Sequence, residues 1–565
     1  MNDIHLQRGN SPLSALAGTL IENRYLARNF RGELIETPGD MFHRVAASVA
    51  RADRLFDPAA DVSKTAANFE AALASLSFLP NSPCLMNAGR PQGHLAACFV
   101  LPVKDTLESM FQTLKEAALI YEASGGIGFS FSRLRPREDT ILQARGGAAG
   151  PVSFMRLLDA VAGLMDQNRT RPAANMAVLD ISHPDIEAFI NAKQTRGDLR
   201  HFNLSVAVGE QFMDCLNSAR DYPLIHPRTG NAVGCKNAEK IFEKIVSSAW
   251  QTGDPGLLFI DRVNQDNPVP GMGRLSATNP CGEQPLLPYE SCTLGSINLT
   301  KVVANSEIDF CKLDRLTRTA VHFLDNALEI NNYPLRQIQE VSLTSRKIGL
   351  GVMGFADMLI LLNIPYQSDR AVAVAGRIMS HIQSSAEAES ASLSLIRGNF
   401  PCFDHSIFPG QGVLLRRNAT LTTVAPTGTI SLIAGVSSGI EPVFSFKGQR
   451  RINGVLIDDI HPIYARYHEV QKTIAKEVFQ TAWDVAPEWH LKVQAAFQRH
   501  TDNAVSKTVN LPESATRADV RQIFLNAHTM GLKGITVYRD KSHGDQVLNA
   551  CTFHREDGSV SSACF

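Results

Sequence analysis

Apolar residues recur at three- and four-residue spacing over two stretches near the start of the chain, residues 40–54 and residues 62–79. This spacing gathers the apolar side chains on one face and predicts amphipathic helices. Asn81-Ser82-Pro83 then stops the helical pattern, because a proline inside a helix removes a backbone hydrogen bond. We therefore expect residues 1–80 to form an N-terminal helical region.

Short runs rich in β-branched and aromatic residues alternate with longer amphipathic helices over most of the remaining chain. The clearest runs are residues 98–103, 203–208, 421–425 and 534–538. This alternation favours an α/β fold with a largely parallel sheet, which we assign to residues 81–548. The composition turns polar after Leu548, so residues 549–565 are expected to form a flexible C-terminal tail.

Charge and composition exclude several classes of protein. Lys plus Arg total 55 and Asp plus Glu total 56, so the formal charge of −1 gives no overall basic field for holding nucleic acid. The chain has no run of about 18 apolar residues and no secretory signal, so we expect a cytoplasmic protein without membrane segments. Ten cysteines in 565 residues are too few for a disulfide scaffold.

Common ligand-binding motifs are mostly absent. The chain has no Gly-Lys-Ser/Thr phosphate loop, and His468-Glu469 is followed by Lys472 where a zinc protease needs a second histidine. Gly126-x-Gly128 is followed by Phe131 rather than by the third glycine of a dinucleotide-binding fingerprint. ATPase, zinc protease and Rossmann dehydrogenase functions therefore lose most of their support, and no metal site is predicted.

The loop Asn279-Pro280-Cys281-Gly282-Glu283 brings a carboxamide, a thiol and a carboxylate within five residues. Proline and glycine on either side of the cysteine disfavour a regular element and expose the sulfur at a turn. A nearby carboxylate disfavours a thiolate by like-charge repulsion, which argues against an ordinary nucleophile. A neutral thiol that carries hydrogen atoms meets no such objection. On local chemistry the loop is therefore either a redox or radical site or a structural turn.

Two further polar loops have the composition of phosphate-binding sites. Residues 422–431 read as a strand that runs into hydroxyl-bearing residues and then a helix, where free amides and hydroxyls suit an anion. An ordinary Ser/Thr helix cap is the alternative there. Residues 124–131 are rich in glycine and precede Arg133 and Arg135, which can grip phosphate. A tight strand entry with surface arginines is the alternative for this second loop.

Taken in order, these segments closely resemble the ribonucleotide reductase family, and within it the adenosylcobalamin-dependent class II enzymes. The resemblance covers roughly residues 18–548, and the ordered set is highly specific although any one segment could be chance. The segments that carry it are Arg24-Tyr25-Leu26, Asn81-Ser82-Pro83, residues 97–102, residues 124–131, Asn175-Met176, residues 183–187, residues 279–283, Glu290-Ser291-Cys292, residues 425–444 and residues 534–540.

The resemblance implies a ten-stranded α/β barrel, made of two five-stranded parallel half-barrels that run antiparallel to each other, with the cysteine loop as a central finger. It identifies Cys281 as the thiyl radical that takes hydrogen from the 3′ carbon of the ribose. Glu283 would be the general base on the 3′ hydroxyl, and Asn279 would help to hold the ribose hydroxyls. Cys98 and Cys292 match the pair that delivers two electrons, protonates the departing 2′ hydroxyl and ends as a disulfide.

Binding residues and partners are also implied by the resemblance. The substrate would be a ribonucleoside di- or triphosphate, and its candidate binding residues are Ser82, Arg171, Thr427, Gly428, Thr429 and Ser431. Asp105 and Arg135 match residues that hold an effector deoxynucleotide at the interface of a homodimer. Cys551 and Cys564 in the tail are candidates for a shuttle pair that passes electrons inward from a thioredoxin-like or glutaredoxin-like reductant.

The source of the radical separates the classes of this family. Class I enzymes receive it from a metal subunit through adjacent tyrosines, whereas the matching segment here reads Thr536-Val537-Tyr538. Class III enzymes use a glycyl radical near the C-terminus and lack the glutamate that corresponds to Glu283, while this chain ends Ser561-Ser562-Ala563-Cys564-Phe565. Adenosylcobalamin is therefore the expected cofactor. Pro172 departs from the family's pattern, because it stiffens the loop that links effector to substrate.

Two alternatives stand beside the class II interpretation. The first is a class I-like catalytic subunit that needs a partner metal radical subunit. The second is a degenerate homologue that only binds nucleotides as a regulatory module. A binder needs neither radical nor redox thiols, so the second is disfavoured by the joint retention of Cys98, Asn279, Cys281, Glu283 and Cys292.

Overall fold

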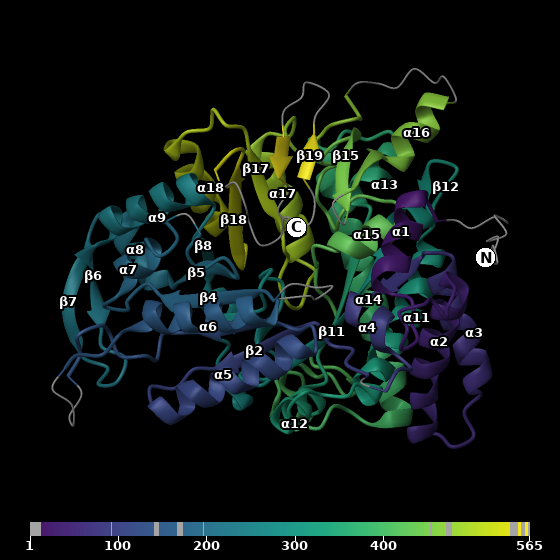
Figure 1. The fold of residues 1–565 in the computed structure, drawn as a ribbon, viewed down its shortest axis with the longest axis horizontal. Helices are drawn as coiled ribbons and strands as arrows, with labels where there is room; N and C mark the ends of the chain where they lie inside the picture. Colours follow the sequence, from purple (N-terminus) through teal and green to yellow (C-terminus); the bar gives the residue numbers. More distant parts are fainter. Residues whose placement is uncertain are drawn as a thin grey trace.

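The computed structural model describes residues 13–91, 93–140, 146–166, 173–195, 197–452, 455–469, 477–542, 552–554 and 560–562. In Figure 1 the N-terminal helices lie to one side of a set of strands, and the helices α5 to α9 lie on the other side. The helices in the first part of the chain are α1 (Ala15–Arg24), α2 (Pro38–Ala50), α3 (Val62–Ala74), α4 (Ser82–Asn87), α5 (Leu107–Glu122), α6 (Pro151–Met165), α7 (Ile186–Ile190), α8 (Glu210–Asn217) and α9 (Ala238–Thr252).

Later helices pack around the second half of the strands. They are α10 (Ile260–Gln265), α11 (Phe310–Ile330), α12 (Arg336–Ser345), α13 (Phe355–Leu361), α14 (Asp369–Arg397), α15 (Gly428–Ala434), α16 (Pro462–Glu469), α17 (Pro487–Gln498) and α18 (Arg517–Thr529). The helices α2 and α3 pack against each other and against α11, so the N-terminal region shares one hydrophobic core with the strands behind it.

The first half of the strands is parallel throughout. The strands β2 (Cys98–Pro102), β3 (Gly126–Ser130), β4 (Asn175–Asp180), β5 (Phe202–Val208) and β8 (Gly256–Phe259) neighbour one another in this order. Helices connect them, as expected for parallel strands, which need long crossovers. Their side chains are almost entirely buried, which explains the continuous apolar runs of the sequence.

The second half is also parallel and closes the barrel. The strand β11 (Ser291–Asn298) pairs with β14 (Ile348–Met353), and β17 (Thr508–Leu511) pairs with β18 (Gly534–Arg539). Residues 422–424 and 505 join these two pairs through parallel bridges, Leu350 to Thr422 and Val424 to Val505. Antiparallel pairing of β11 with β2 and of β18 with β8 then joins the halves. Each half thus consists of parallel strands, and the two halves run antiparallel to each other. This arrangement confirms the predicted barrel.

Three local predictions need correction. The helix predicted over residues 62–79 ends at Ala74, and Phe78–Pro80 forms the strand β1, because its buried residues pair with β11. Residues 421–425 form single bridges rather than the predicted strand. Asn81 begins a helix rather than ending one, since its side chain accepts a hydrogen bond from the Cys84 amide at 2.9 Å and so caps α4.

Smaller hairpins and sheets are not part of the ten-stranded barrel, although the hairpin of β9 and β10 lies inside it. They are β6 (Asp221–Ile225) with β7 (Ala232–Asn237), β9 (Ala277–Thr278) with β10 (Pro285–Leu286), and β12 (Val303–Ala304) with β13 (Glu307–Ile308). The strands β15 (Lys447–Ile452) and β16 (Val455–Ile460) pair with each other, and β15 also pairs with β19 (Thr552–His554), which pairs with β20 (Val560–Ser562). The described residues of the predicted tail thus join a small sheet.

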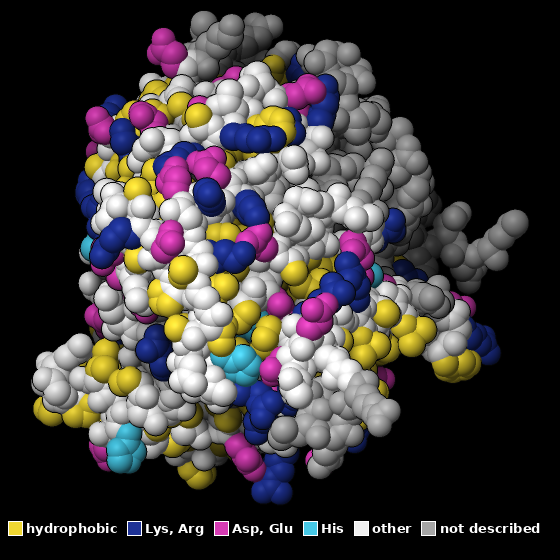
Figure 2. All heavy atoms as spheres, turned by 90° about the vertical axis from the view of Figure 1, so that its left-hand side faces the viewer, with side chains coloured by type: hydrophobic (Ala, Val, Ile, Leu, Met, Phe, Trp, Pro, Cys, Tyr) yellow, Lys and Arg dark blue, Asp and Glu magenta, His cyan; other side chains and the backbone are white. Residues whose placement is uncertain are grey.

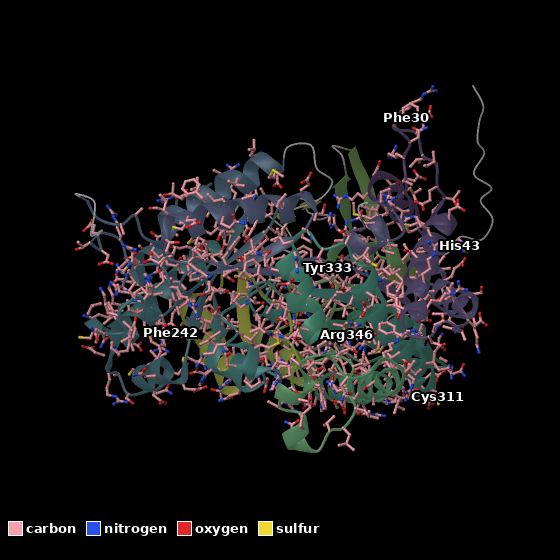
Figure 3. The ribbon with its side chains drawn as sticks, turned by 90° about the horizontal axis from the view of Figure 1, so that it is seen from below. Phe30, His43, Phe242, Cys311, Tyr333 and Arg346 are labelled. Atoms are coloured by element: carbon pink, nitrogen blue, oxygen red, sulfur yellow. The ribbon has the colours of Figure 1, made fainter. Side chains whose placement is uncertain are left out.

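A buried ionic cluster ties the N-terminal helices to the barrel. Asp325 accepts hydrogen bonds from Arg346 at 2.6 Å and from Arg397 at 2.7 Å, and Arg397 also contacts Asp53 at 2.7 Å. Burial alone would raise the pKa of Asp325, but the neighbouring arginines, Arg346 first, hold it well below its usual range. Figure 3 shows Arg346 in the interior, whereas Phe30, His43 and Cys311 lie toward the periphery.

The surface carries both signs of charge. Figure 2 shows Lys and Arg side chains scattered among Asp and Glu on one face, without a large area of either sign. Within the described residues, no helix combines the length and apolar character needed to cross a membrane. Nor do these residues contain a group of three or more His, Cys, Asp or Glu side chains placed to hold a metal ion.

Candidate active site

The hairpin of β9 and β10 carries the cysteine loop between the two halves of the barrel. From the first half, the Asn203 side chain on β5 donates a hydrogen bond to the carbonyl oxygen of Pro280 at 3.0 Å. From the second half, the Thr423 hydroxyl and the Ala504 amide donate to the carbonyl oxygen of Glu283 at 2.8 and 3.0 Å. The loop is therefore held inside the barrel from both sides.

Glycines in the surrounding strands make room for this hairpin. A Cβ atom at Gly128 would lie only 1.9 Å from the carbonyl oxygen of Thr278, and one at Gly126 would lie 2.9 Å from Cγ of Pro280. On β14, a Cβ at Gly349 would lie 2.5 Å from Nε2 of Gln284. The glycines of residues 124–131 thus allow close approach of the chain's own hairpin, which favours the packing alternative over phosphate binding at that segment.

Three of the predicted catalytic residues meet at the start of β2 and β11. Cys98 and Cys292 stand directly opposite each other in the antiparallel pairing, where Cβ atoms are about 4.5–5.5 Å apart. The Asn279 amide donates a hydrogen bond to the Cys98 sulfur at 3.1 Å. Glu283 is buried two residues beyond the partly exposed Cys281. The fold therefore gathers residues that are far apart in the sequence.

A buried ion pair beside Cys292 was missed by the sequence analysis. Lys347 donates to Glu290 at 2.8 Å, and the Ser345 hydroxyl donates to the same carboxylate at 2.5 Å. Burial raises the pKa of the Cys292 thiol well above its usual value, and Glu290 adds to this effect while Lys347 opposes it. Cys292 is thus held as a neutral thiol. Its proximity to Glu290 was visible in the segment Glu290-Ser291-Cys292, but the lysine was not.

A cavity reaches Cys281 from another direction. It is bounded by the hairpin tip, by β5, β8 and β18, and by residues 505–508, and its lining includes Cys281, Glu441 and Tyr538. None of Cys98, Asn279, Glu283 and Cys292 lines it. The same loop therefore reaches the cysteine pair through Asn279 and this separate cavity through Cys281.

The predicted phosphate loop is folded around its own hydroxyl groups. Thr427 has a left-handed backbone at the start of α15, and its Oγ1 accepts a hydrogen bond from the Gly439 amide at 2.8 Å. Ser431 is buried, with its Oγ 3.1 Å from the hydroxyl of Ser438. Gly428 and Thr429 are partly exposed. Of the four predicted binding residues in this loop, Gly428 and Thr429 are therefore the more accessible to a ligand.

The other predicted binding residues do not belong to the loop of residues 422–431. The Ser82 hydroxyl is 2.8 Å from the hydroxyl of Tyr25. Asp105 and Arg135 pair with each other, with Nε of Arg135 2.8 Å from the carboxylate. Arg171, Cys551 and Cys564 lie outside the described residues.

Comparison with known proteins agrees with this architecture. The barrel domain of ribonucleotide reductase matches residues 96–412 and 415–538, and the all-alpha domain of ribonucleotide reductase matches residues 12–93. The chain therefore belongs to the ribonucleotide reductase large-subunit family, as the resemblance predicted.

Several relatives carry a more specific name. The chain is 45% identical to the vitamin B12-dependent ribonucleoside-diphosphate reductase of Mycobacterium tuberculosis strain CDC 1551 / Oshkosh, over 96% of this chain and 82% of that protein. It is 40% identical to the protein of the same name from Thermoplasma acidophilum, over 96% of this chain and 80% of the relative. A vitamin B12-dependent ribonucleotide reductase of Streptomyces clavuligerus is 28% identical over 87% of this chain and 61% of its own length.

Proposed function

We propose that this chain is a vitamin B12-dependent ribonucleoside-diphosphate reductase, which converts ribonucleotides to 2′-deoxyribonucleotides through a radical at Cys281. The observation that carries the proposal is the contact chain at the hairpin. Asn279, on the same loop as Cys281, donates to the sulfur of Cys98, which stands opposite Cys292. The names of the relatives in Mycobacterium tuberculosis and Thermoplasma acidophilum support the diphosphate substrate.

The chemistry of the site residues balances as a two-electron reduction. Cys281 takes the hydrogen atom from the 3′ carbon and later returns it, while Glu283 accepts the proton of the 3′ hydroxyl. One thiol of the pair gives a proton to the 2′ hydroxyl, which leaves as water. The second thiol supplies the hydrogen that forms the new C–H bond at the 2′ carbon, so Cys98 and Cys292 together lose two electrons and two protons and end as a disulfide. Burial of Cys292 supports this role, since a neutral thiol is a proton donor.

The adenosyl group of adenosylcobalamin fits the cavity beside Cys281 by the chemistry of the cavity lining. Strand backbone and apolar side chains such as Met176 and Leu258 can face a nucleoside, and Glu441 offers a carboxylate to hydroxyl groups. When bound, this cofactor supplies a carbon radical by homolysis of its cobalt–carbon bond. The residues proposed to hold the adenosyl group are those on β8 and β18 and Glu441. Tyr538 lines the same cavity after Val537, so an adjacent tyrosine pair of the class I kind is lacking at this segment.

Binding of the substrate phosphates is proposed at the loop that begins α15. Thr427, Gly428, Thr429 and Ser431 would bind the phosphates, Thr427 and Ser431 mainly through the backbone because their hydroxyl groups already have partners. Ser82 and Arg171 are further candidates for substrate binding. A thioredoxin-like or glutaredoxin-like protein would re-reduce the pair, with Cys551 and Cys564 as a proposed shuttle. Redox thiols of this kind suit the cytoplasm.

A homodimer is proposed through α5 and α6. These helices pack against each other and leave large apolar side chains in solvent. The most exposed are Leu107 at 73%, Leu164 at 66% and Phe111 at 59%. The Asp105–Arg135 pair, proposed for the deoxynucleotide effector, lies next to the start of α5. Light scattering should report a dimer, and Phe111→Glu should shift it toward monomer; a monomeric native protein refutes this assembly.

One reconstitution separates the candidate functions. The purified chain is incubated with a ribonucleoside diphosphate, adenosylcobalamin and a dithiol, with no other protein. Formation of the deoxyribonucleotide supports the proposal. Activity that appears only with a metal-containing subunit would instead establish a class I-like enzyme. Nucleotide binding without turnover under both conditions would establish a regulatory homologue.

A further inference from the structure

Two carboxylates line the cavity beside Cys281, and they differ in exposure. Glu441 follows the proposed phosphate loop, and its side chain is 18% exposed. Asp254 lies before β8, and its side chain is 10% exposed. Lys507 is also among the lining residues, although its side chain is fully buried, and the rest of the lining is mainly strand backbone, apolar side chains and a few hydroxyl and amide groups. Glu441 is thus the more accessible of the two anionic groups.

Glu441 is fixed in place by residues 507 and 508. The Thr508 amide donates to Oε1 at 2.8 Å, and Nζ of Lys507 donates to Oε2 at 2.5 Å. Lys507 also contacts Nδ1 of His490 at 2.8 Å and the carbonyl oxygen of Thr508 at 3.2 Å, so its three protons all have acceptors. Its side chain is fully buried. The ammonium group of Lys507 is therefore directed at its three acceptors, and the Glu441 carboxylate is the group that a ligand in the cavity can contact.

Burial and neighbouring charges shift the pKa values of Lys507 and His490. Burial lowers the pKa of Lys507, and the Glu441 carboxylate opposes that shift. Burial and the neighbouring Lys507 hold the pKa of His490 well below its usual value, so His490 is neutral and its Nδ1 accepts the lysine proton. An ionised carboxylate only accepts hydrogen bonds, so Glu441 offers a ligand acceptors and no donor.

Such a group selects among the ligands that the cavity admits. Each carboxylate oxygen has two lone-pair sites, so Glu441 retains acceptor capacity after its contacts with Thr508 and Lys507. It repels phosphate, and the buried lysine has no proton left to offset that repulsion. It attracts neutral donors, of which the adjacent hydroxyls of a ribose are the best match. Acidic residues bind ribose hydroxyls in the same way in dinucleotide-binding folds.

We infer that Glu441 binds the ribose hydroxyls of the nucleoside that enters the Cys281 cavity, which under the proposed function is the adenosyl group of the cofactor. Lys507 is a positioning residue that holds the carboxylate toward the cavity. The inference rests on the proposed function for the identity of the nucleoside, and on the cavity lining and the contacts of Glu441 for the assignment of the residue.

The test compares two nucleosides that differ only in the groups Glu441 would bind. Binding of 5′-deoxyadenosine and of 2′,3′,5′-trideoxyadenosine is measured by equilibrium dialysis in the presence of cob(II)alamin, with no turnover required. The native protein should prefer 5′-deoxyadenosine by at least about tenfold, because hydrogen bonds to a charged group are stronger than neutral ones. In Glu441→Gln the ratio should fall toward one.

Asp254→Asn is the matched control. Asp254 lines the same cavity and is held in the same way, by the Leu204 amide at 2.9 Å and by Lys193 at 2.7 Å. This variant should keep the preference for the nucleoside with hydroxyls. If Glu441→Gln binds neither nucleoside, Glu441→Asp decides, since it keeps the charge but withdraws it from the cavity and should show a reduced ratio.

The outcomes separate the inference from the proposed function. The assignment of Glu441 would be overturned if Glu441→Gln kept the native preference for 5′-deoxyadenosine over 2′,3′,5′-trideoxyadenosine. It would also be overturned if Glu441→Asp, where that variant decides, kept the full native preference, or if Asp254→Asn lost the preference instead. Absence of any preference in the native protein would also overturn it. The proposed function fails separately, if adenosylcobalamin does not support reduction by the native chain.

Discussion

Gly128→Ala should disable the enzyme by displacing the cysteine hairpin. The added Cβ would lie 1.9 Å from the Thr278 carbonyl oxygen and 2.7 Å from its carbonyl carbon, both backbone atoms that cannot rotate away. Ordinary contact begins at 3.4 Å, so Thr278 must retreat by the difference, about 1.5 Å. Thr278 directly precedes the loop of Asn279 and Cys281. Because a displacement of about 1 Å at reacting groups costs on the order of 100-fold in rate, kcat/KM should fall at least that far.

The assay is reduction of a ribonucleoside diphosphate with adenosylcobalamin, together with thermal unfolding. Overpacking of this kind destabilises by about 1–3 kcal/mol, so Gly128→Ala should remain folded but melt earlier. Gly376→Ala is the control, because a Cβ there meets nothing within 4 Å and the site lies in α14. It should keep full activity. A fully active Gly128→Ala would refute the claim that the glycine exists to admit the hairpin.

Three further perturbations test other parts of the structure. Cys98→Ser should retain nucleotide binding but lose multiple-turnover reduction, since no disulfide can form with Cys292; undiminished turnover refutes the pair. Asp325→Asn should lower the free energy of unfolding in urea by about 3–5 kcal/mol, because it leaves buried arginines without their carboxylate; a loss of less than about 1 kcal/mol speaks against the cluster. The hydrogen bond that His201 donates to the Asp159 carboxylate raises the pKa of His201 above 6.5 despite burial. Its stabilisation is therefore complete below pH 6.5 and lost as pH rises through the higher folded pKa, and His201→Gln should remove that pH dependence of Tm.

Local patterns in the sequence predicted the alternation of strands and helices, but they did not predict the closure of the barrel. Residues 98–102 are a continuous apolar run, and residues 534–539 are rich in β-branched and aromatic residues, so both strands are detectable from the local sequence. Closure depends instead on the bridges from Leu350 to Thr422 and from Val424 to Val505, which join distant segments and carry no local signal. The resemblance to a known family supplied the barrel before the structure showed it.

The candidate active site was likewise predictable from the sequence only in part. The composition of the cysteine loop identified Cys281 as chemically unusual, because the residue types stand next to one another. The pairing of Cys98 with Cys292 and of Glu290 with Lys347 arises only when strands and helices far apart in sequence come together. The glycines of residues 124–131 suggested a phosphate site, but the group that approaches Gly128 is the chain's own backbone at Thr278.

The most direct test of the radical role of Cys281 compares the native chain with Cys281→Ser. Binding of a labelled ribonucleoside diphosphate is measured by equilibrium dialysis, and deoxyribonucleotide formation is measured on the same preparations with adenosylcobalamin and a dithiol. The account predicts native nucleotide affinity and no product above background for the variant, because serine cannot carry the hydrogen atom. Deoxyribonucleotide formation by Cys281→Ser at the native rate would contradict it.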